Sequence, residues 1–332
     1  MRKNQPWIIG FLLSTAVILI VLSFRYPFLI QKNGNWSVGF QKIKSPIEKI
    51  HPHSNQILTF ESHNLNTEKK VKFLADPFFI SFNNLHYIFF EEQAEGNANI
   101  AYYVSRDRKN YKYGGVVLDE DFHLSFPQVF RYKDEMFLLP EARGSKHLIL
   151  YKATIFPKEW EIADTLIYNF NLKDPAILLS DDFNIITASD DNLKQYVFKA
   201  DSLRDKWIKA DEFESRIGDE TRAGGNFFQY EGEWYVPFQN NSRGYGTGLS
   251  LYRLNYIPNK FLKFKREVDF QLYPQNKIEW FNRGMHHLNI TKNGDKYFAV
   301  YDGDRKTGKY KWAWKASLKY NYYDLIRFFQ NI

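Results

Sequence analysis

Residues that could carry acid, base or ionic chemistry recur at matching positions of a repeated pattern in this chain. The repeats start at positions 76, 126, 174, 224 and 286, so the first four starts are 48 to 50 residues apart and the fifth follows after 62. One such residue lies at or beside the start of each repeat: Asp76, Ser125, Asp174, Arg222 and His286. A second lies where the following apolar stretch ends: Glu91, Glu141, Asp190, Gln239 and Asp302.

This combination of acids with one arginine and one histidine suits proton transfer, cation binding or sugar chemistry. Crowded carboxylates repel one another, so their pKa values move apart. Two carboxylates that flank a glycosidic bond are the usual apparatus of glycoside hydrolysis. Arg222 could clamp a phosphate or a carboxylate, or it could be a structural counter-ion. Acids and amides also favour turns, so each residue has a structural alternative.

The elements that must position these residues are strands. Each repeat has a polar or Pro/Gly start, an apolar run, a short turn and a second aromatic-rich run, and such a period is typical of a β-propeller. We therefore predict an all-β fold, a five-bladed propeller over residues 71–318. The first strand of a blade begins near the axis and the second returns beside it, so the two residue sets should meet on one face. Hairpin turns are expected at Asn83-Asn84, Lys133-Asp134, Asp181-Asp182, Glu231-Gly232 and Asn293-Gly294.

The segments outside the repeats also allow structural predictions. Residues 25–70 form a connector, in which a strand near Trp36 is expected to close the ring as an outer strand. The extra length before the fifth repeat, residues 255–284, is expected to be a functional loop or lid. Residues 319–332 predict a helical cap on the propeller, and helical apolar spacing begins at Leu318. The lysine-rich stretch 305–319 predicts a solvated surface, or else a contact with an anionic membrane or phosphate.

The amino terminus predicts a membrane anchor. After a tail of residues 1–6, residues 7–24 carry no charge and are long enough to span a bilayer. No small-x-small cleavage site follows, which favours an anchor over a signal peptide. The short basic start favours a propeller outside the cytoplasm, whereas basic residues after the helix oppose this orientation.

Composition excludes some classes of site and partner. The chain has no cysteine, so disulfides and thiolate metal sites are excluded. The net charge of +7 is modest, and we predict no nucleic-acid partner. No spacing typical of a zinc site is present.

Further residues are expected to contact a substrate. His123 precedes the second blade, where a structural hydrogen bond is the alternative. Gly224 and Gly225 would let a ligand approach the backbone, unless they form a plain bulge. Tyr245 lies in a glycine-rich segment that lacks the lysine and the strand–helix context of a phosphate loop. His286 and His287 would face opposite sides of a strand, so only His286 is expected to point into the ring.

The Asp-Pro starts at Asp76 and Asp174, the Phe126-Pro127 start and "GMHH" in the fifth repeat resemble the five-bladed family 43 glycosidases. The resemblance implies that Asp76 is a general base and that Asp174 tunes a pKa and orients substrate. It also implies that His286 supports a central Ca²⁺ or water cluster. The family's general acid would fall at Ala223, beside Arg222, so the acid is missing from the expected position.

A second resemblance covers residues 35–316. The segments "HLSFP", "RAGG" and "VYDGDR" are similar to the amino-terminal domain of plant glucosamine inositolphosphorylceramide transferases and to stand-alone bacterial relatives. This resemblance implies work on glycoconjugates, in the company of polysaccharide assembly enzymes.

Three functions follow as hypotheses. The first is a membrane-anchored, glycosyltransferase-like enzyme of envelope polysaccharide or glycolipid assembly. In it Asp76 or Glu141 deprotonates an acceptor hydroxyl and Arg222 holds a leaving phosphate. The second is a periplasmic glycosidase of the family 43 type. The third is a non-catalytic glycan-binding propeller that presents substrate to a partner enzyme.

Overall fold

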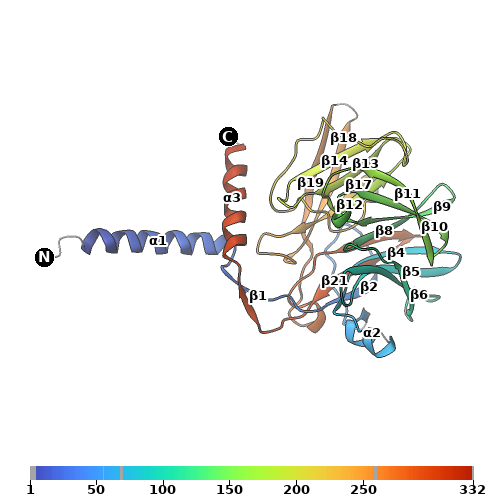
Figure 1. Cartoon of the computed structure of the whole chain (residues 1–332), viewed down its shortest axis with the longest axis horizontal. Coiled ribbons are helices and arrows are strands. Elements are labelled where there is room, and N and C mark those ends of the chain that lie inside the picture. The colour runs from blue at the N-terminus through green and yellow to red at the C-terminus, as the bar shows by residue number, and fades with distance from the viewer. Residues whose placement is uncertain (1–4, 55, 68–69, 258–259, 331–332) are drawn as a thin grey trace.

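The chain folds into the predicted five-bladed β-propeller (Figure 1). The structure, a computed structural model, describes residues 5–54, 56–67, 70–257 and 260–330. The predicted tail 1–6 and the C-terminal segment 319–332 therefore lie partly outside the described residues. Within the described residues, five four-stranded antiparallel sheets surround the axis.

The first four blades each use four consecutive strands. Blade I contains β4 (Phe73–Phe82), β5 (Leu85–Gln93), β6 (Ala98–Ser105) and β7 (Lys112–Leu118). Blade II contains β8 (Ser125–Tyr132), β9 (Glu135–Glu141), β10 (Leu148–Ile155) and β11 (Glu159–Ile167). Blade III contains β12 (Lys173–Leu179), β13 (Asn184–Ser189), β14 (Gln195–Ala200) and β15 (Ile208–Lys209). Blade IV contains β16 (Phe228–Tyr230), β17 (Glu233–Asn240), β18 (Gly248–Ile257) and β19 (Phe261–Leu272).

Blade V joins the two ends of the chain. It contains β20 (Leu288–Asn293), β21 (Lys296–Asp304), β2 (Trp36–Ile43) and β3 (Ile57–Leu58), in that order. The strand expected near Trp36 is present, and β2 pairs with β21 over its whole length, from Trp36 opposite Asp304 to Ile43 opposite Tyr297. The N-terminal segment thus closes the ring.

The extra residues before blade V do not form a lid, and that expectation is wrong. They contain β19, the outer strand of blade IV, which pairs antiparallel with β18. Leu262 and Phe264 are buried and alternate with exposed lysines, which is the pattern of a half-buried strand. After β19 the chain reaches blade V through a short 3-10 helix, Glu279–Phe281.

Tight turns set the register of the inner hairpins. Asn83 and Asn84 have φ values of 50° and 59°, and such a pair of positive φ values is typical of a type I′ turn. In blade V the turn lies one residue later than expected, because Asn293 pairs with Lys296 and leaves Gly294 and Asp295 as the loop.

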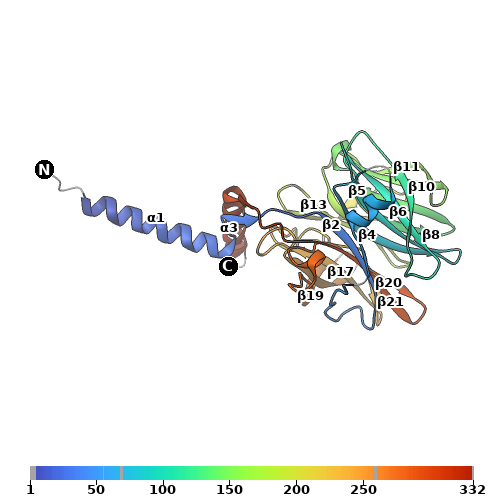
Figure 2. The same ribbon diagram turned by 90° about the horizontal axis from the view of Figure 1, so that it is seen from below.

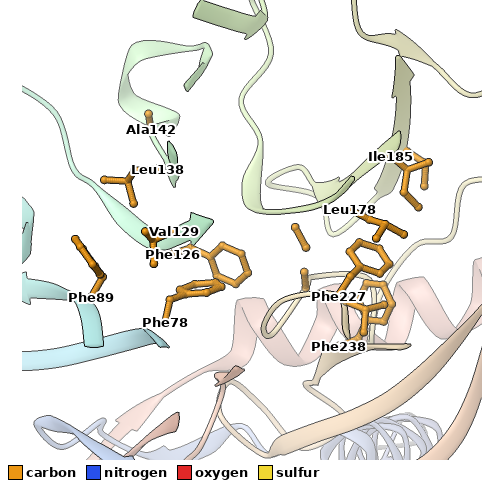
Figure 3. Packing of buried hydrophobic residues seen from close by; sticks show 14 of the residues in the cluster. Phe78, Phe89, Phe126, Val129, Leu138, Ala142, Leu178, Ile185, Phe227 and Phe238 are labelled. Carbon is orange, nitrogen blue, oxygen red and sulfur yellow. The ribbon is translucent and has the colours of Figure 1, made fainter. Parts of the chain in front are cut away.

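Aromatic side chains fill the space between blades. Figure 3 shows Phe78 of blade I beside Phe126 of blade II. The rings of Phe78 and Phe126 meet edge to face with centroids 4.9 Å apart. Each fully buried large side chain contributes about 1.5–3 kcal/mol, so the inner strands form a rigid base for the residues at their ends.

The two chain termini leave the propeller together. Helix α1 (Gln5–Arg25) projects away from it, and residues Trp7–Arg25 are long and apolar enough to cross a membrane, a test that a signal sequence also passes (Figures 1 and 2). Strand β1 (Leu29–Gln31) pairs with β22 (Tyr310–Trp312), directly before helix α3 (Trp314–Gln330). A further short helix, α2 (Phe60–Asn66), follows β3.

Helix α3 differs from the predicted cap in two ways. It begins at Trp314, five residues before the predicted start at position 319. Its apolar stripe also does not pack on the propeller, since Leu318, Tyr322 and Leu325 are exposed. Contact with the protein is made instead by Ser317, Tyr320 and Tyr323, which are buried.

Candidate functional site

Three inner strands begin with the same backbone irregularity. In β4, β8 and β12 the pairing register shifts at an Xaa-Pro pair. The residue before the proline has a left-handed φ of 50° at Asp76, 48° at Phe126 and 46° at Asp174. This conformation costs on the order of 1 kcal/mol for a residue other than glycine, and aspartate tolerates it better than most. The bulge re-aims each side chain toward the neighbouring blades.

The bulges correct the expected alignment of blade II. Phe126, and not Ser125, is the counterpart of Asp76 and Asp174. Ser125 is buried and pairs with Glu141, as Ala75 pairs with Glu91 in blade I. Blade II therefore places an aromatic ring at the position where blades I and III place a carboxylate.

The first cluster of charged residues joins blades I and V. The imidazole of His286 lies between two carboxylates, with Nε2 3.1 Å from Oδ1 of Asp76 and Nδ1 3.1 Å from Oδ2 of Asp302. Burial alone would lower the pKa of His286, but Asp302 and Asp76 raise it to about 10. Burial would raise the pKa of Asp76, yet the hydrogen bond and charge of His286 hold it well below the usual range. The cluster is thus an imidazolium between two carboxylates.

His287 lies in this cluster as well, so the expectation that only His286 points inward is wrong. Its Nδ1 is 3.5 Å from Oδ1 of Asp76. The two histidines precede β20, so strand alternation does not apply to them. Burial lowers the pKa of His287, which packs edge-on against Phe78 and Phe126 as a neutral ring.

The first cluster also contains the group of possible metal ligands found among the described residues. Asp76, His286 and Asp302 offer ligand atoms within 4.8 Å of one another. Ca²⁺ takes six to eight oxygen ligands. Here both ring nitrogens already face carboxylates at ion-pair distance, so the imidazolium occupies the place of a cation. The donor set therefore does not fit the Ca²⁺ ion that the family 43 resemblance implies.

The second cluster joins blades II, III and IV around Asp174. Arg222 donates to this carboxylate from Nε and from Nη2, the latter at 3.1 Å. Gln239 Nε2 donates to Oδ2 of Asp174 at 2.6 Å. The backbone amide of Asp174 donates to Oε2 of Glu141 at 3.0 Å, and Arg222 Nη2 lies 3.7 Å from the same oxygen.

Glu141 and Asp174 differ sharply in their environments. Asp174 is fully buried and receives three side-chain hydrogen bonds, two of them from the arginine. Burial and the neighbouring charge of Asp174 raise the pKa of Glu141 to about 8, although Arg222 opposes the shift. One carboxyl is therefore held as a charge partner and the other can exchange a proton near neutral pH.

Glu91 and His123 form a pair beside the first cluster. His123 Nε2 lies 3.0 Å from Oε1 of Glu91. Burial raises the pKa of Glu91 to about 7, a shift that the hydrogen bond from His123 opposes. The same hydrogen bond raises the pKa of His123, whose side chain is 48% exposed. His123 is thus a solvent-facing imidazole oriented by a buried carboxyl.

Aromatic rings form one wall of the site, and sequence reasoning missed one of them. Trp36, the first residue of β2, lies 4.3 Å from the His286 ring between centroids. The predicted Tyr245 lies 4.9 Å from the same ring, and the Arg222 guanidinium lies 5.8 Å from the Tyr245 centroid. The expectation that this strand closes the ring was the signal that could have placed Trp36 beside the blade V histidines.

Three predicted residues lie outside these clusters. Asp190 accepts hydrogen bonds from the backbone of Asn192 and Lys194 within its own turn. Gly224 and Gly225 bring β-blades IV and V together, since a Cβ at Gly225 would lie 1.9 Å from the carbonyl oxygen of Leu288. The structure thus gathers most of the predicted residues into the charged clusters and places these glycines and Asp190 outside them.

Few side chains of the charged clusters are exposed to solvent. Asp76, Glu91, Glu141 and Asp174 are each no more than 5% exposed. The side chain of Arg222 is 19% exposed, so it and His123 are the charged groups through which a substrate would meet the clusters.

Solved structures share this fold. An α-L-arabinofuranosidase from Clostridium thermocellum aligns with a TM-score of 0.53 and 14% identity, covering 68% of this chain and 81% of that enzyme. An α-L-arabinofuranosidase from Podospora anserina aligns with a TM-score of 0.53 and 10% identity, covering 81% and 98%. The expected likeness to glycosidase propellers is confirmed at the level of the fold.

Curated proteins with higher sequence identity to this chain are named as transferases, not as glycosidases. Glucosamine inositolphosphorylceramide transferase 1 of Oryza sativa subsp. japonica is 27% identical over 323 residues, which cover 86% of this chain and 43% of the relative. The Arabidopsis thaliana protein of the same name is 26% identical over 305 residues, which cover 82% and 39%. The chain thus spans less than half the length of these relatives. Residues 30–304 match the family described as glucosamine inositolphosphorylceramide transferase 1, N-terminal, and the chain belongs to that family.

Proposed function

We propose that this chain is a membrane-anchored, glycosyltransferase-like enzyme that passes a sugar from a phosphate-activated donor to a hydroxyl of a glycan or glycolipid. The observation that carries the proposal is the pairing of Glu141, whose pKa is raised to about 8, with the Arg222 guanidinium 3.7 Å away. A proton acceptor and an anion-binding group are the two parts that such a transfer needs.

Glu141 is the better of the two bases considered from the sequence. An effective general base has a pKa near the working pH, which Glu141 meets. The pKa of Asp76 is held well below its usual range by His286, so Asp76 is a weak base. In the proposed step the acceptor O–H proton moves to Glu141 and the acceptor oxygen bonds to the anomeric carbon. The bond from that carbon to the phosphate oxygen breaks, and its electron pair leaves with the phosphate.

Arg222 would hold the departing phosphate. Its Nε and Nη2 groups are engaged by Asp174, which fixes the plane of the guanidinium. Among the described residues, none accepts a hydrogen bond from its Nη1 group. Tyr245 would supply an aromatic face for a sugar ring beside this group.

The setting of the reaction is part of the proposal. Anchoring by α1 would keep the enzyme at a membrane, with the propeller outside the cytoplasm. The name of the relatives supports a glycolipid or related glycoconjugate as acceptor. Enzymes of polysaccharide assembly as partners are a further part of the proposal.

Glycan binding without turnover is a second candidate, favoured by the near-complete burial of the carboxylates. A glycosidase of the family 43 type is less well supported. Carboxylates do lie near Asp76, because its amide donates to Asp302 Oδ2 at 3.2 Å. The blade IV position that should carry the general acid, however, holds Ala223 with Arg222 before it.

Donor binding tests the role of Arg222. Full-length protein in nanodiscs would be titrated calorimetrically with a panel of nucleotide-activated hexoses and hexosamines. We expect Arg222→Ala to weaken binding of the preferred donor by roughly tenfold or more, and Arg222→Lys to restore part of it. Arg131→Ala, on an exposed hairpin, is the matched control. If Arg222→Ala binds the donor as the wild type does, Arg222 does not hold the phosphate.

A further inference from the structure

Helix α3 has two faces of opposite character. One face is fixed to the protein: the Tyr320 ring stacks on Tyr26 with centroids 4.8 Å apart, and Arg327 Nη2 lies 3.5 Å from Asp219. Lys319 Nζ donates to the carbonyl oxygen of Asp191 at 2.8 Å. These contacts hold α3 in one orientation on the side of the propeller from which α1 departs.

The other face is a continuous apolar stripe without a protein partner among the described residues. Its members are 44% to 65% exposed and follow helical spacing: Trp314, Leu318, Tyr322, Leu325, Phe328 and Phe329. A stripe of large apolar side chains on the outside of a soluble domain marks an interaction site. An amphipathic helix with aromatic and aliphatic residues on one face is typical of binding in a membrane interface.

The position of α3 specifies what covers the stripe. Arg25, the last residue of α1, pairs with Asp324 of α3 and with Asp219 of the propeller. Asn321 Nδ2 of α3 donates to the carbonyl oxygen of Leu22 at 3.0 Å. Figures 1 and 2 both show α3 at the propeller end of α1, and Figure 1 shows it crossing the direction of α1 at a steep angle. A bilayer spanned by α1 would therefore have its surface along α3.

The residues that flank the stripe also suit a membrane surface. Trp312 is 75% exposed and Trp314 is 51% exposed, and tryptophan is enriched where the bilayer meets water. Lys311 and Lys315 are exposed beside them, and lysines near the surface attract anionic lipid headgroups. Exposed aromatic and cationic groups thus lie next to the apolar stripe in sequence.

We propose that α3 is an interfacial helix that lies in the membrane surface beside α1 and holds the propeller in a fixed orientation there. The occupant of the stripe is a lipid bilayer that contains anionic lipids. This inference concerns the membrane contact alone and does not depend on the transfer reaction proposed above.

The placement brings the candidate site to the bilayer. Tyr320, on the inner side of α3, stacks on Tyr26, which lines the same cavity as Tyr245, and the Arg222 guanidinium lies 5.8 Å from the Tyr245 centroid. A cavity of about 750 Å³ opens beside α3, with Tyr26, Tyr245 and Trp314 among its lining residues. A substrate carried by a lipid would meet this opening without leaving the membrane surface.

Spin labels test the contact, and the absence of native cysteine makes each label unique. Leu325→Cys places a label on the stripe, at a side chain that is 53% exposed. Ile162→Cys is the matched control, because Ile162 is 61% exposed on β11, on the far side of the propeller in Figure 1. Both full-length variants would be placed singly in nanodiscs of phosphatidylcholine and phosphatidylglycerol, after thermal unfolding has shown that each retains the wild-type Tm.

Collision of each label with apolar oxygen and with a polar nickel chelate gives its depth. We expect oxygen accessibility at Leu325 to exceed nickel accessibility several-fold, and the reverse at Ile162. Equal nickel accessibility at both positions would place the stripe in water and overturn the proposal. Shielding of the Leu325 label from both reagents would place protein on the stripe, and would overturn it as well.

Discussion

At the scale of single residues, the buried aspartates Asp76, Asp174 and Asp302 are paired with two cations, and Asp76 and Asp302 share His286. Asp174 is held by Arg222, and Asp76 by His286. Glu141 lies 3.7 Å from Arg222 and Glu91 lies 3.0 Å from His123, yet burial raises their pKa values to about 8 and 7. The site therefore contains charged anchors and proton-exchanging carboxyls side by side, which is the arrangement that acid–base chemistry requires.

Removing the cation from the blade III pair should be costly. Arg222→Ala leaves Asp174 as a buried charge without its main partner, so we expect a loss of about 3–5 kcal/mol in the free energy of unfolding. Denaturant unfolding of the full chain in detergent measures it. Arg131→Ala removes only an exposed pair with Asp134 and should change stability by about 0.5 kcal/mol or less. Equal losses in the two variants would show that the Asp174 pair is not a stabilising contact.

Glu141 should make stability depend on pH. Its folded pKa of about 8 lies above the ordinary value of 4.5, so the folded state binds the proton more tightly than the unfolded state. Stability is then fully present below about pH 4.5 and falls as the pH rises toward 8. We expect Glu141→Gln to reduce this fall by on the order of 2–4 kcal/mol. The measurement is the free energy of unfolding of the wild type and of Glu141→Gln from pH 4.5 to 8.5. Parallel profiles for the two proteins would show that the pKa of Glu141 is not raised.

At the scale of elements, Xaa-Pro bulges and a strand borrowed from the N terminus build the site. The bulges turn Asp76 and Asp174 out of the strand alternation. Strand β2 supplies Trp36 and completes blade V. Both features depend on hydrogen-bonded pairing within a sheet, which a loop does not provide.

Deleting β2 should unfold the propeller. Trp36, Val38 and Phe40 are buried, and loss of their burial costs roughly 5 kcal/mol or more. That loss is comparable with the whole stability of a typical domain. We expect a chain that starts at Lys44 to lack a cooperative thermal transition, whereas a chain that starts at Arg25 retains one. An unchanged Tm for the shorter chain would show that blade V closes without β2.

The sequence predicted the elements better than their exact alignment. The repeat spacing and the turn residues predicted five blades, the inner hairpins and the closing strand near Trp36. Spacing aligns Ser125 with the aspartates, because register shifts at Xaa-Pro pairs cannot be counted from spacing. Asp190 cannot be separated from the site residues by sequence, because an acid in a turn resembles an acid at a strand end. Strand β19 lies outside the repeat period, and only its alternation of buried and exposed residues identifies it as a strand.

At the scale of the whole molecule, both chain ends leave on the face that carries the site. Strands β1 and β22 pair there, and the helices next to them in sequence, α1 and α3, extend away from the ring. In our proposal this arrangement keeps the site against a membrane. The exposed β11 side of blade II then faces away from it.

The side of the membrane can be tested with one residue. We expect Ile162→Cys to react with a membrane-impermeant maleimide added to cells whose cytoplasmic membrane is intact. The reason is that the short basic start favours an amino terminus in the cytoplasm. Wild-type protein, which has no cysteine, is the control. Labelling only after lysis would place the propeller in the cytoplasm.

The most direct test of the proposed function is sugar transfer by the purified full-length chain in nanodiscs. Radiolabelled nucleotide-activated hexosamines would serve as donors and a glycolipid fraction as acceptor. We expect transfer by the wild type and by Arg131→Ala, and a rate lower by about 100-fold or more for Glu141→Gln, since a positioned base contributes about 10²–10⁴. Transfer by Glu141→Gln at the wild-type rate would contradict the assignment of the base. Absence of transfer by the wild type from every donor, with glycan binding intact, would contradict the proposed function.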